Sequence, residues 1–228
     1  MNYMLFLWAI LYSGVFTLSE WLCTRLCLNN SYICIAAFTY IVAFVVWINK
    51  NNKQKTAGLL LGKIELKSII TMLPLLVFPI YNLWISDGSK VTVYTAFIAI
   101  IVAFVEEIFF RGFIQNGFIQ KNFISGILKT NIIFSLYHMV NIFSGNDIEY
   151  VVWQMICAFV IGICYSFVAM MNSSIIPSAI LHCMINITGI SVDKVFDIKM
   201  LQIVLFYIIY AFILLKKCSK IYYKQEIK

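Results

Sequence analysis

Apolar stretches about as long as a membrane span recur along this chain, and charged residues lie mostly in the short segments between them. A helix of roughly 20 apolar residues is long enough to cross the hydrocarbon core of a bilayer. The pattern therefore predicts an all-α fold, a polytopic transmembrane helical bundle of about eight spans. The predicted spans are 2–26, 31–48, 68–86, 91–110, 124–143, 150–170, 175–191 and 199–215.

The composition supports an integral membrane protein. Of the 228 residues, 62% are hydrophobic and only 12% are charged. A soluble domain usually carries about twice that share of charge, so the surplus apolar surface is expected to face lipid. No repeat, low-complexity tract or linker divides the chain, and residues 1–228 are predicted to form a single integral membrane domain. Residues 111–123 mix polar and aromatic side chains, which predicts an amphipathic continuation of the fourth span at the interface.

The formal net charge of +7 has an uneven distribution. Lysines cluster in the segment 50–67 and in the tail 216–228. Basic residues at the ends of spans are typical of cytoplasmic segments. The charge therefore indicates a multi-pass protein of the cell membrane with both termini in the cytoplasm, in contact with the lipid bilayer, and it does not indicate a nucleic-acid partner.

The N-terminus and the cysteines add two further expectations. Residues 1–22 lack a basic leader and a small-residue cleavage site, so they are predicted to be a retained first span. The seven cysteines are odd in number, fall mostly in apolar runs and form no C-x-x-C pair. They are expected to be small buried hydrophobic residues and not a disulfide framework or a thiolate metal site.

Two adjacent acids and an arginine interrupt the fourth apolar run. Ionisable side chains at membrane depth are costly and usually functional. Glu107 and Arg111 are four residues apart, so on a helix they share a face and can pair. Glu106 points roughly 100° away from that face. The spacing predicts that Glu107 and Arg111 form a structural ion pair and that Glu106 is free for chemistry.

The only two histidines of the chain also lie in apolar helices. A single buried histidine is more often a hydrogen-bonded structural residue, but His138, His182 and Asn186 occur with the acids on separate spans. Buried polar groups need partners in lipid, so these side chains are expected to converge. Measured from the predicted inner boundary, Glu106 lies about 8 Å deep, His182 about 12 Å and His138 about 18 Å. His138 is thus expected about two helical turns deeper in the membrane than the depth at which the site residues would meet.

These residues carry a resemblance to a known family. The motifs are Glu106-Glu107-x-x-Phe110-Arg111-Gly112, Phe134-x-x-x-His138 and His182-x-x-x-Asn186. In order and spacing they resemble the CPBP family of CAAX-protease and bacteriocin-processing membrane endopeptidases, also called the Abi family. The resemblance covers about residues 91–189 and implies an intramembrane endopeptidase, a hydrolase whose active site lies within the membrane.

The resemblance also implies roles for the site residues. Glu106 and His138 would hold and deprotonate the attacking water, while His182 and Asn186 would donate hydrogen bonds to the oxyanion. The expected partner is a peptide or membrane-protein substrate. Family members process leader peptides, pheromones or bacteriocins, or carry out CAAX-type C-terminal proteolysis.

Metal dependence and two other functions stay open at this point. Some of the family has been classed as metalloproteases, and Glu106, His138 and His182 could supply three zinc ligands. The chain has no H-E-x-x-H motif, so a glutamate-driven reaction without a cofactor is favoured over zinc. The alternatives to a protease are a non-catalytic bacteriocin immunity or peptide-binding membrane protein of the same fold, and a proton-coupled transporter that uses the acid and the histidines as a relay.

Overall fold

The structure, a computed structural model, describes residues 31–51, 66–120, 122–143, 145–192 and 197–226, with isolated positions 7, 8, 11, 14, 15, 18, 19, 22, 25, 26, 53, 58 and 59. The described part of the chain contains helices and no strand, and the predicted all-α class is confirmed. The predicted first span, 2–26, lies largely outside the described residues.

Five helical segments of the described residues are long and apolar enough to cross a bilayer. They are Ser68–Ile85, Val93–Ile119, Phe123–Ile142, Ile148–Asn172 and Ile198–Lys220. Phe38–Lys50 and Ile176–Gly189 are shorter apolar helical segments. A multi-pass helical bundle is therefore present, whereas the count of eight spans is not confirmed by the described residues.

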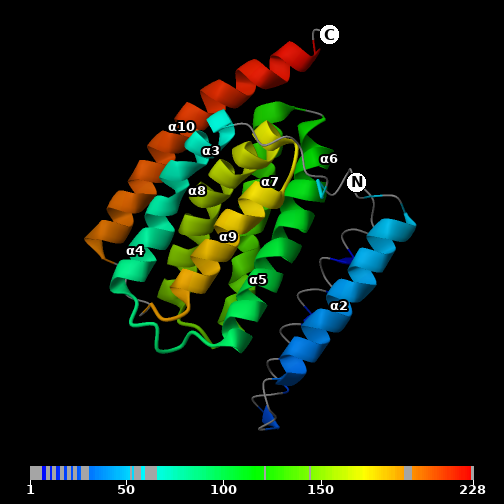
Figure 1. Cartoon of the computed structure of the whole chain (residues 1–228), viewed down its shortest axis with the longest axis vertical. Helices are drawn as coiled ribbons and strands as arrows, with labels where there is room; N and C mark the ends of the chain where they lie inside the picture. The colour runs from blue at the N-terminus through cyan, green and yellow to red at the C-terminus, as the bar shows by residue number, and fades with distance from the viewer. Residues whose placement is uncertain are drawn as a thin grey trace.

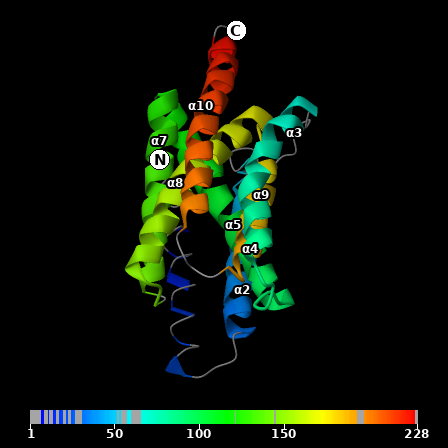
Figure 2. The ribbon, with the colours of Figure 1, turned by 90° about the vertical axis from the view of Figure 1, so that its left-hand side faces the viewer.

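The helices pack side by side in a bundle with short connections (Figure 1). In chain order they are α2 (Ser31–Lys50), α3 (Leu66–Met72), η1 (Leu73–Leu76), α4 (Val77–Ile85), α5 (Val93–Glu107), η2 (Ile108–Gln115), α6 (Asn116–Ile119), α7 (Phe123–Tyr137), η3 (His138–Ile142), α8 (Ile148–Asn172), α9 (Ile176–Gly189) and α10 (Ile198–Glu226). Figure 2 shows α10 running along the outside of this bundle. Its inward face packs on α8 and α4 through residues such as Tyr207 and Leu214.

Local sequence explains where several helices begin. Thr92 caps α5, because its hydroxyl accepts from the backbone N–H of Thr95 in a capping box. Asn122 caps α7 by accepting from the N–H of Ser125. Pro74 stands at the start of the 3₁₀ turn η1, which interrupts the third predicted span between α3 and α4.

The segment after the acidic pair differs from the sequence prediction. Residues 111–123 were expected to lie at the interface, but Ile108–Gln115 forms a π-helical stretch within the span, and most of its side chains are buried. The physical reason is that its polar groups find partners inside the bundle. Arg111 donates to the Gly162 carbonyl on α8, and Gln115 donates to the Ser166 carbonyl on the same helix. Arg111 is therefore buried inside the bundle and is not a basic residue of the membrane interface.

An aromatic seam joins α2 to the π-helical stretch. Phe44 stacks on Phe109 with ring centroids 4.8 Å apart, and Trp47 meets Phe113 edge-on at 6.5 Å. Such pairs add about 0.5–1.5 kcal/mol beyond the area they bury. Four of the cysteines, Cys157, Cys164, Cys183 and Cys218, are free and buried, in keeping with their expected apolar role.

At Gly162, α8 packs tightly against Arg111 and Asn131. A Cβ atom added at Gly162 would stand 2.4 Å from Asn131 Oδ1 and 2.8 Å from Arg111 Nη2. We expect Gly162→Ala to destabilise the protein by about 1–3 kcal/mol, because the added methyl group overpacks a fixed polar cluster. Thermal unfolding of the purified protein in detergent measures the effect. Gly117→Ala is the matched control, since nothing lies within 4 Å of its added Cβ; an equal loss in both variants would contradict the packing argument.

Candidate active site

Glu107 is the hub of a buried polar cluster. The Glu107 carboxylate accepts from Arg111 Nη1 at 2.9 Å and from Ser178 Oγ at 2.8 Å, and its Oε1 lies 3.1 Å from His182 Nδ1. The carboxylates of Glu106 and Glu107 lie on adjacent residues of α5, whereas Ser178 and His182 come from α9. A charge buried this deeply requires such compensation, since an unpaired ion in the interior costs several kcal/mol.

Arg111 completes this cluster from the next turn. Its side chain is fully buried, and Nη2 donates to Asn131 Oδ1 at 3.3 Å and to the Gly162 carbonyl at 3.1 Å. The guanidinium carbon also lies 4.3 Å from the centroid of the Phe134 ring, a cation–π arrangement. The predicted ion pair between Glu107 and Arg111 is therefore present, with Asn131 and Gly162 as partners that the sequence did not indicate.

Glu106 takes a different environment from its neighbour. Among the described residues its one polar contact is with His182, whose Nε2 lies 3.7 Å from Glu106 Oε2. Only 6% of Glu106 is exposed, yet it lines a cavity. The two acids thus separate as helix geometry predicted, one held in an ion pair and the other facing open space.

In both histidines the geometry identifies Nδ1 as a hydrogen-bond donor. A carboxylate oxygen only accepts, so Nδ1 of His182 carries the proton that it donates to Glu107, and Nε2 faces Glu106. His138 likewise donates from Nδ1 to the Phe134 carbonyl at 2.9 Å, which leaves Nε2 for other partners. Each imidazole is thus oriented by a hydrogen bond on its Nδ1 side.

The four predicted site residues line one cavity of about 970 Å³. Glu106 comes from α5, His138 from the start of η3, and His182 and Asn186 from α9. The depth difference expected for His138 does not exclude it from this cavity. Within the described residues, however, no hydrogen bond joins His138 to Glu106 or to His182, so the structure brings His138 to the cavity wall without a direct contact.

Phe134 and Asn186 shape the wall of this cavity. The Phe134 ring lies edge-on to both imidazoles, with centroids 4.9 Å from His138 and 6.0 Å from His182. Asn186 Nδ2 donates to the Ala99 carbonyl of α5 over 3.4 Å, which ties α9 to the helix of the acids. Phe134 therefore packs between the two histidines, as expected from its position one turn before His138.

Sequence reasoning missed two contributors to this site. Ser178 lies four residues before His182, so the helical spacing could have placed it on the same face. Tyr165 on α8 lines the cavity beside His182, with ring centroids 5.8 Å apart. Its buried hydroxyl has no hydrogen-bond partner among the described residues. No sequence signal separates Tyr165 from the other tyrosines.

A metal does not fit the donor positions as they stand. In the part of the chain that the structure describes, no three His, Cys, Asp or Glu side chains are grouped closely enough to hold an ion. Glu106 and His182 lie near each other, and His138 lines the same cavity.

Residues 88–188 match the model of the Rce1-like family, which is described as "Type II CAAX prenyl endopeptidase Rce1-like". Over this segment the chain is similar to the Rce1-like family. The match spans a little under half of the chain and includes Glu106, His138, His182 and Asn186. No curated protein matches the chain. The resemblance seen in the sequence motifs is thereby confirmed, and at the family level it supports a CAAX-type intramembrane endopeptidase.

The buried ion pair predicts a large loss of stability when the charge of Glu107 is removed. We expect Glu107→Gln to lower the free energy of unfolding by about 3–5 kcal/mol, because it leaves the Arg111 guanidinium without its counter-ion in the interior. Thermal unfolding in detergent measures this loss. Glu106→Gln is the matched control, since Glu106 is the residue next to Glu107 but forms no ion pair with Arg111. We expect the Glu106→Gln variant to unfold near the wild-type temperature. Similar unfolding temperatures for wild type and Glu107→Gln would contradict the role of Glu107.

Proposed function

We propose that this protein is an intramembrane endopeptidase that hydrolyses a peptide bond in a membrane-associated peptide or protein. The observation that carries the proposal is the placement of Glu106 in one cavity with His138, His182 and Asn186, inside the segment that matches the endopeptidase family. Leader peptides, pheromones, bacteriocins and CAAX-type C-termini are the substrate classes that the family resemblance implies.

In the proposed reaction Glu106 acts as the general base. A water molecule between Glu106 and His138 donates one hydrogen bond to each, and Nε2 of His138 accepts because its Nδ1 carries the proton. Glu106 removes a proton from this water as its oxygen attacks the carbonyl carbon of the peptide. When the carbon–nitrogen bond breaks, the same proton passes from Glu106 to the leaving amine. Glu106 is then a carboxylate again, as at the start.

The developing oxyanion needs donors in a site shielded from water. We assign this role to Nε2 of His182, in its doubly protonated form, and to the amide of Asn186. The Glu107 carboxylate holds Nδ1 of His182 at 3.1 Å and compensates the positive ring, much as a carboxylate orients the histidine of a catalytic triad. Glu107 and Arg111 are thus positioning residues in this proposal.

The proposed reaction uses no metal ion. No step above depends on a metal ion. We expect purified protein to keep its activity after dialysis against a chelator and to contain less than one metal ion per chain by elemental analysis. Activity that is lost on chelation and restored by zinc would overturn this part of the proposal.

Replacing the proposed base tests the function itself. We expect Glu106→Gln to abolish peptide cleavage by the purified protein, because an amide cannot take the proton from water. The readout is product formation followed by mass spectrometry, with wild type and the variant at equal concentrations of folded protein. Equal product from both would contradict the protease assignment, and retained peptide binding without any product in wild type would favour the non-catalytic alternative.

Asn186→Ala should have a graded effect. Loss of one oxyanion donor typically lowers the rate by about 10²–10³, so the variant is expected to be slow but measurable. The fall should appear in kcat with little change in KM, since the donor acts mainly on the transition state. Asn172→Ala serves as a control, because Asn172 is also a helical asparagine with a hydrogen-bonded side chain, but it bonds to Ser68 and does not line the cavity. Equal rates for wild type and Asn186→Ala would remove Asn186 from the mechanism.

A further inference from the structure

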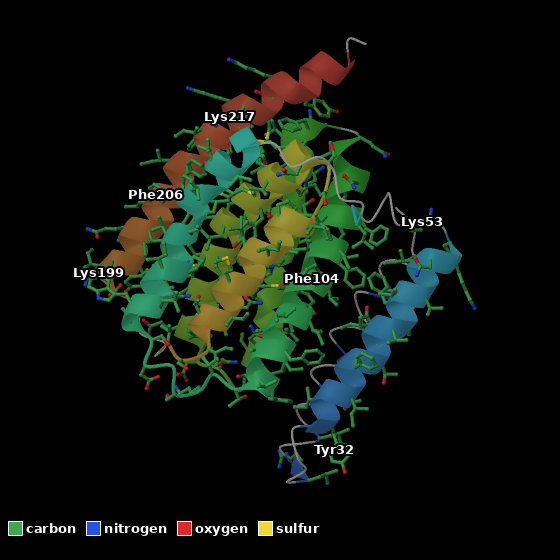
Figure 3. All side chains as sticks on the ribbon, viewed as in Figure 1. Tyr32, Lys53, Phe104, Lys199, Phe206 and Lys217 are labelled. Carbon is green, nitrogen blue, oxygen red and sulfur yellow. The ribbon has the colours of Figure 1, made fainter. Side chains whose placement is uncertain are left out.

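The two ends of the bundle differ in charge. Lys53 and Lys217 lie towards one end, the upper one in Figure 3, and Tyr32 lies towards the other. Besides these lysines, the described residues at the first end include Lys50, Lys216 and Lys220, whereas those at the opposite end include Asp87, Asp147, Glu149 and Asp197, with Lys90 and Lys199. Under the positive-inside rule the basic end faces the cytoplasm and the acidic end faces away from it.

The cavity that holds Glu106 extends to the acidic end. Its lining includes Lys90 in the α4–α5 connection, Asp147 and Glu149 at the start of α8, and Val192 after α9. Glu106 lies 13 residues beyond Val93, the first residue of α5, which corresponds to about 20 Å along the helix. The cavity therefore leads from the acidic end through about half of the Val93–Ile119 segment to the proposed base.

Buried groups close the other side of the site. Glu107, Arg111 and Ser178 lie between Glu106 and the basic end, and each is at most 1% exposed. Beyond them the Gly58 carbonyl accepts from the backbone N–H of Ile175 at 3.0 Å, which places Gly58 against the start of α9. In the described part of the chain, the polar cluster that orients His182 thus also blocks an approach from the basic end.

From these observations we propose that the substrate enters from the extracytoplasmic side, as a peptide segment exposed on that face of the membrane. This inference rests on the proposed endopeptidase function and narrows its substrate class to exported or membrane-anchored peptides that present the scissile bond outside. An extended chain advances about 3.3 Å per residue. Roughly six extended residues would therefore reach from the mouth of the cavity to Glu106.

The orientation can be tested without a substrate. Asp147→Cys places a thiol at the mouth, and Lys216→Cys places one at the basic end, where Lys216 is exposed. A membrane-impermeant maleimide added to intact cells should label Asp147→Cys, and it should label Lys216→Cys only after lysis. Wild type, whose four described cysteines are buried, gives the background. Labelling of Lys216→Cys and not of Asp147→Cys in intact cells would overturn the inference.

A second measurement tests the path to the base. A mixture of charged, internally quenched octapeptides, which cannot cross the bilayer, is added to spheroplasts and to inverted membrane vesicles that contain wild type or Glu106→Gln. We expect cleavage that depends on Glu106 in spheroplasts and its loss in sealed inverted vesicles, with recovery after detergent is added. Cleavage by inverted vesicles alone would overturn the side of entry but leave the endopeptidase function standing. No Glu106-dependent cleavage even in detergent would count against the proposed function and, with it, against this inference.

Discussion

The interaction on which the rest of this site depends is the buried pair between Glu107 and Arg111. Two charges in a low-dielectric interior are tolerated only when good geometry and further hydrogen bonds replace the lost water. Glu107 gains Ser178 and His182 in addition to Arg111, while Arg111 gains Asn131, the Gly162 carbonyl and the face of Phe134. Because these partners come from α7, α8 and α9, the pair fixes the positions of three helices relative to α5.

The ion pair between Glu107 and Arg111 gives the two adjacent acids, Glu106 and Glu107, different roles. Glu107 is occupied by three partners, so its neighbour Glu106 is the carboxylate that faces the cavity and Nε2 of His182. The same cluster holds His182 through Nδ1 and separates the proposed base from the basic end of the bundle. Orientation of the histidine, availability of the base and the direction of access therefore share one physical origin.

The sequence predicted much of this arrangement and missed the rest for identifiable reasons. The apolar runs gave most span positions, and the spacing of Glu106, Glu107 and Arg111 predicted which acid would pair, because helical periodicity is local. The π-helical stretch was not predictable, since it depends on partners such as Gly162 and Ser166, far along the chain on α8. Asn131 was missed for the same reason, since a buried polar partner on a separate helix has no signature in its own segment. Tyr165 was missed because nothing in the sequence separates it from the other tyrosines.

The most direct test of the central claim is a double-mutant cycle on the buried pair, measured as free energy of unfolding in detergent. Glu107→Gln and Arg111→Met each leave one charge without its counter-ion, whereas the double variant removes both charges together. If the pair organises the site as described, the double variant loses less stability than the sum of the two single losses, by about 0.5–3 kcal/mol. Strictly additive losses would show that the two charges do not depend on each other and would contradict the account.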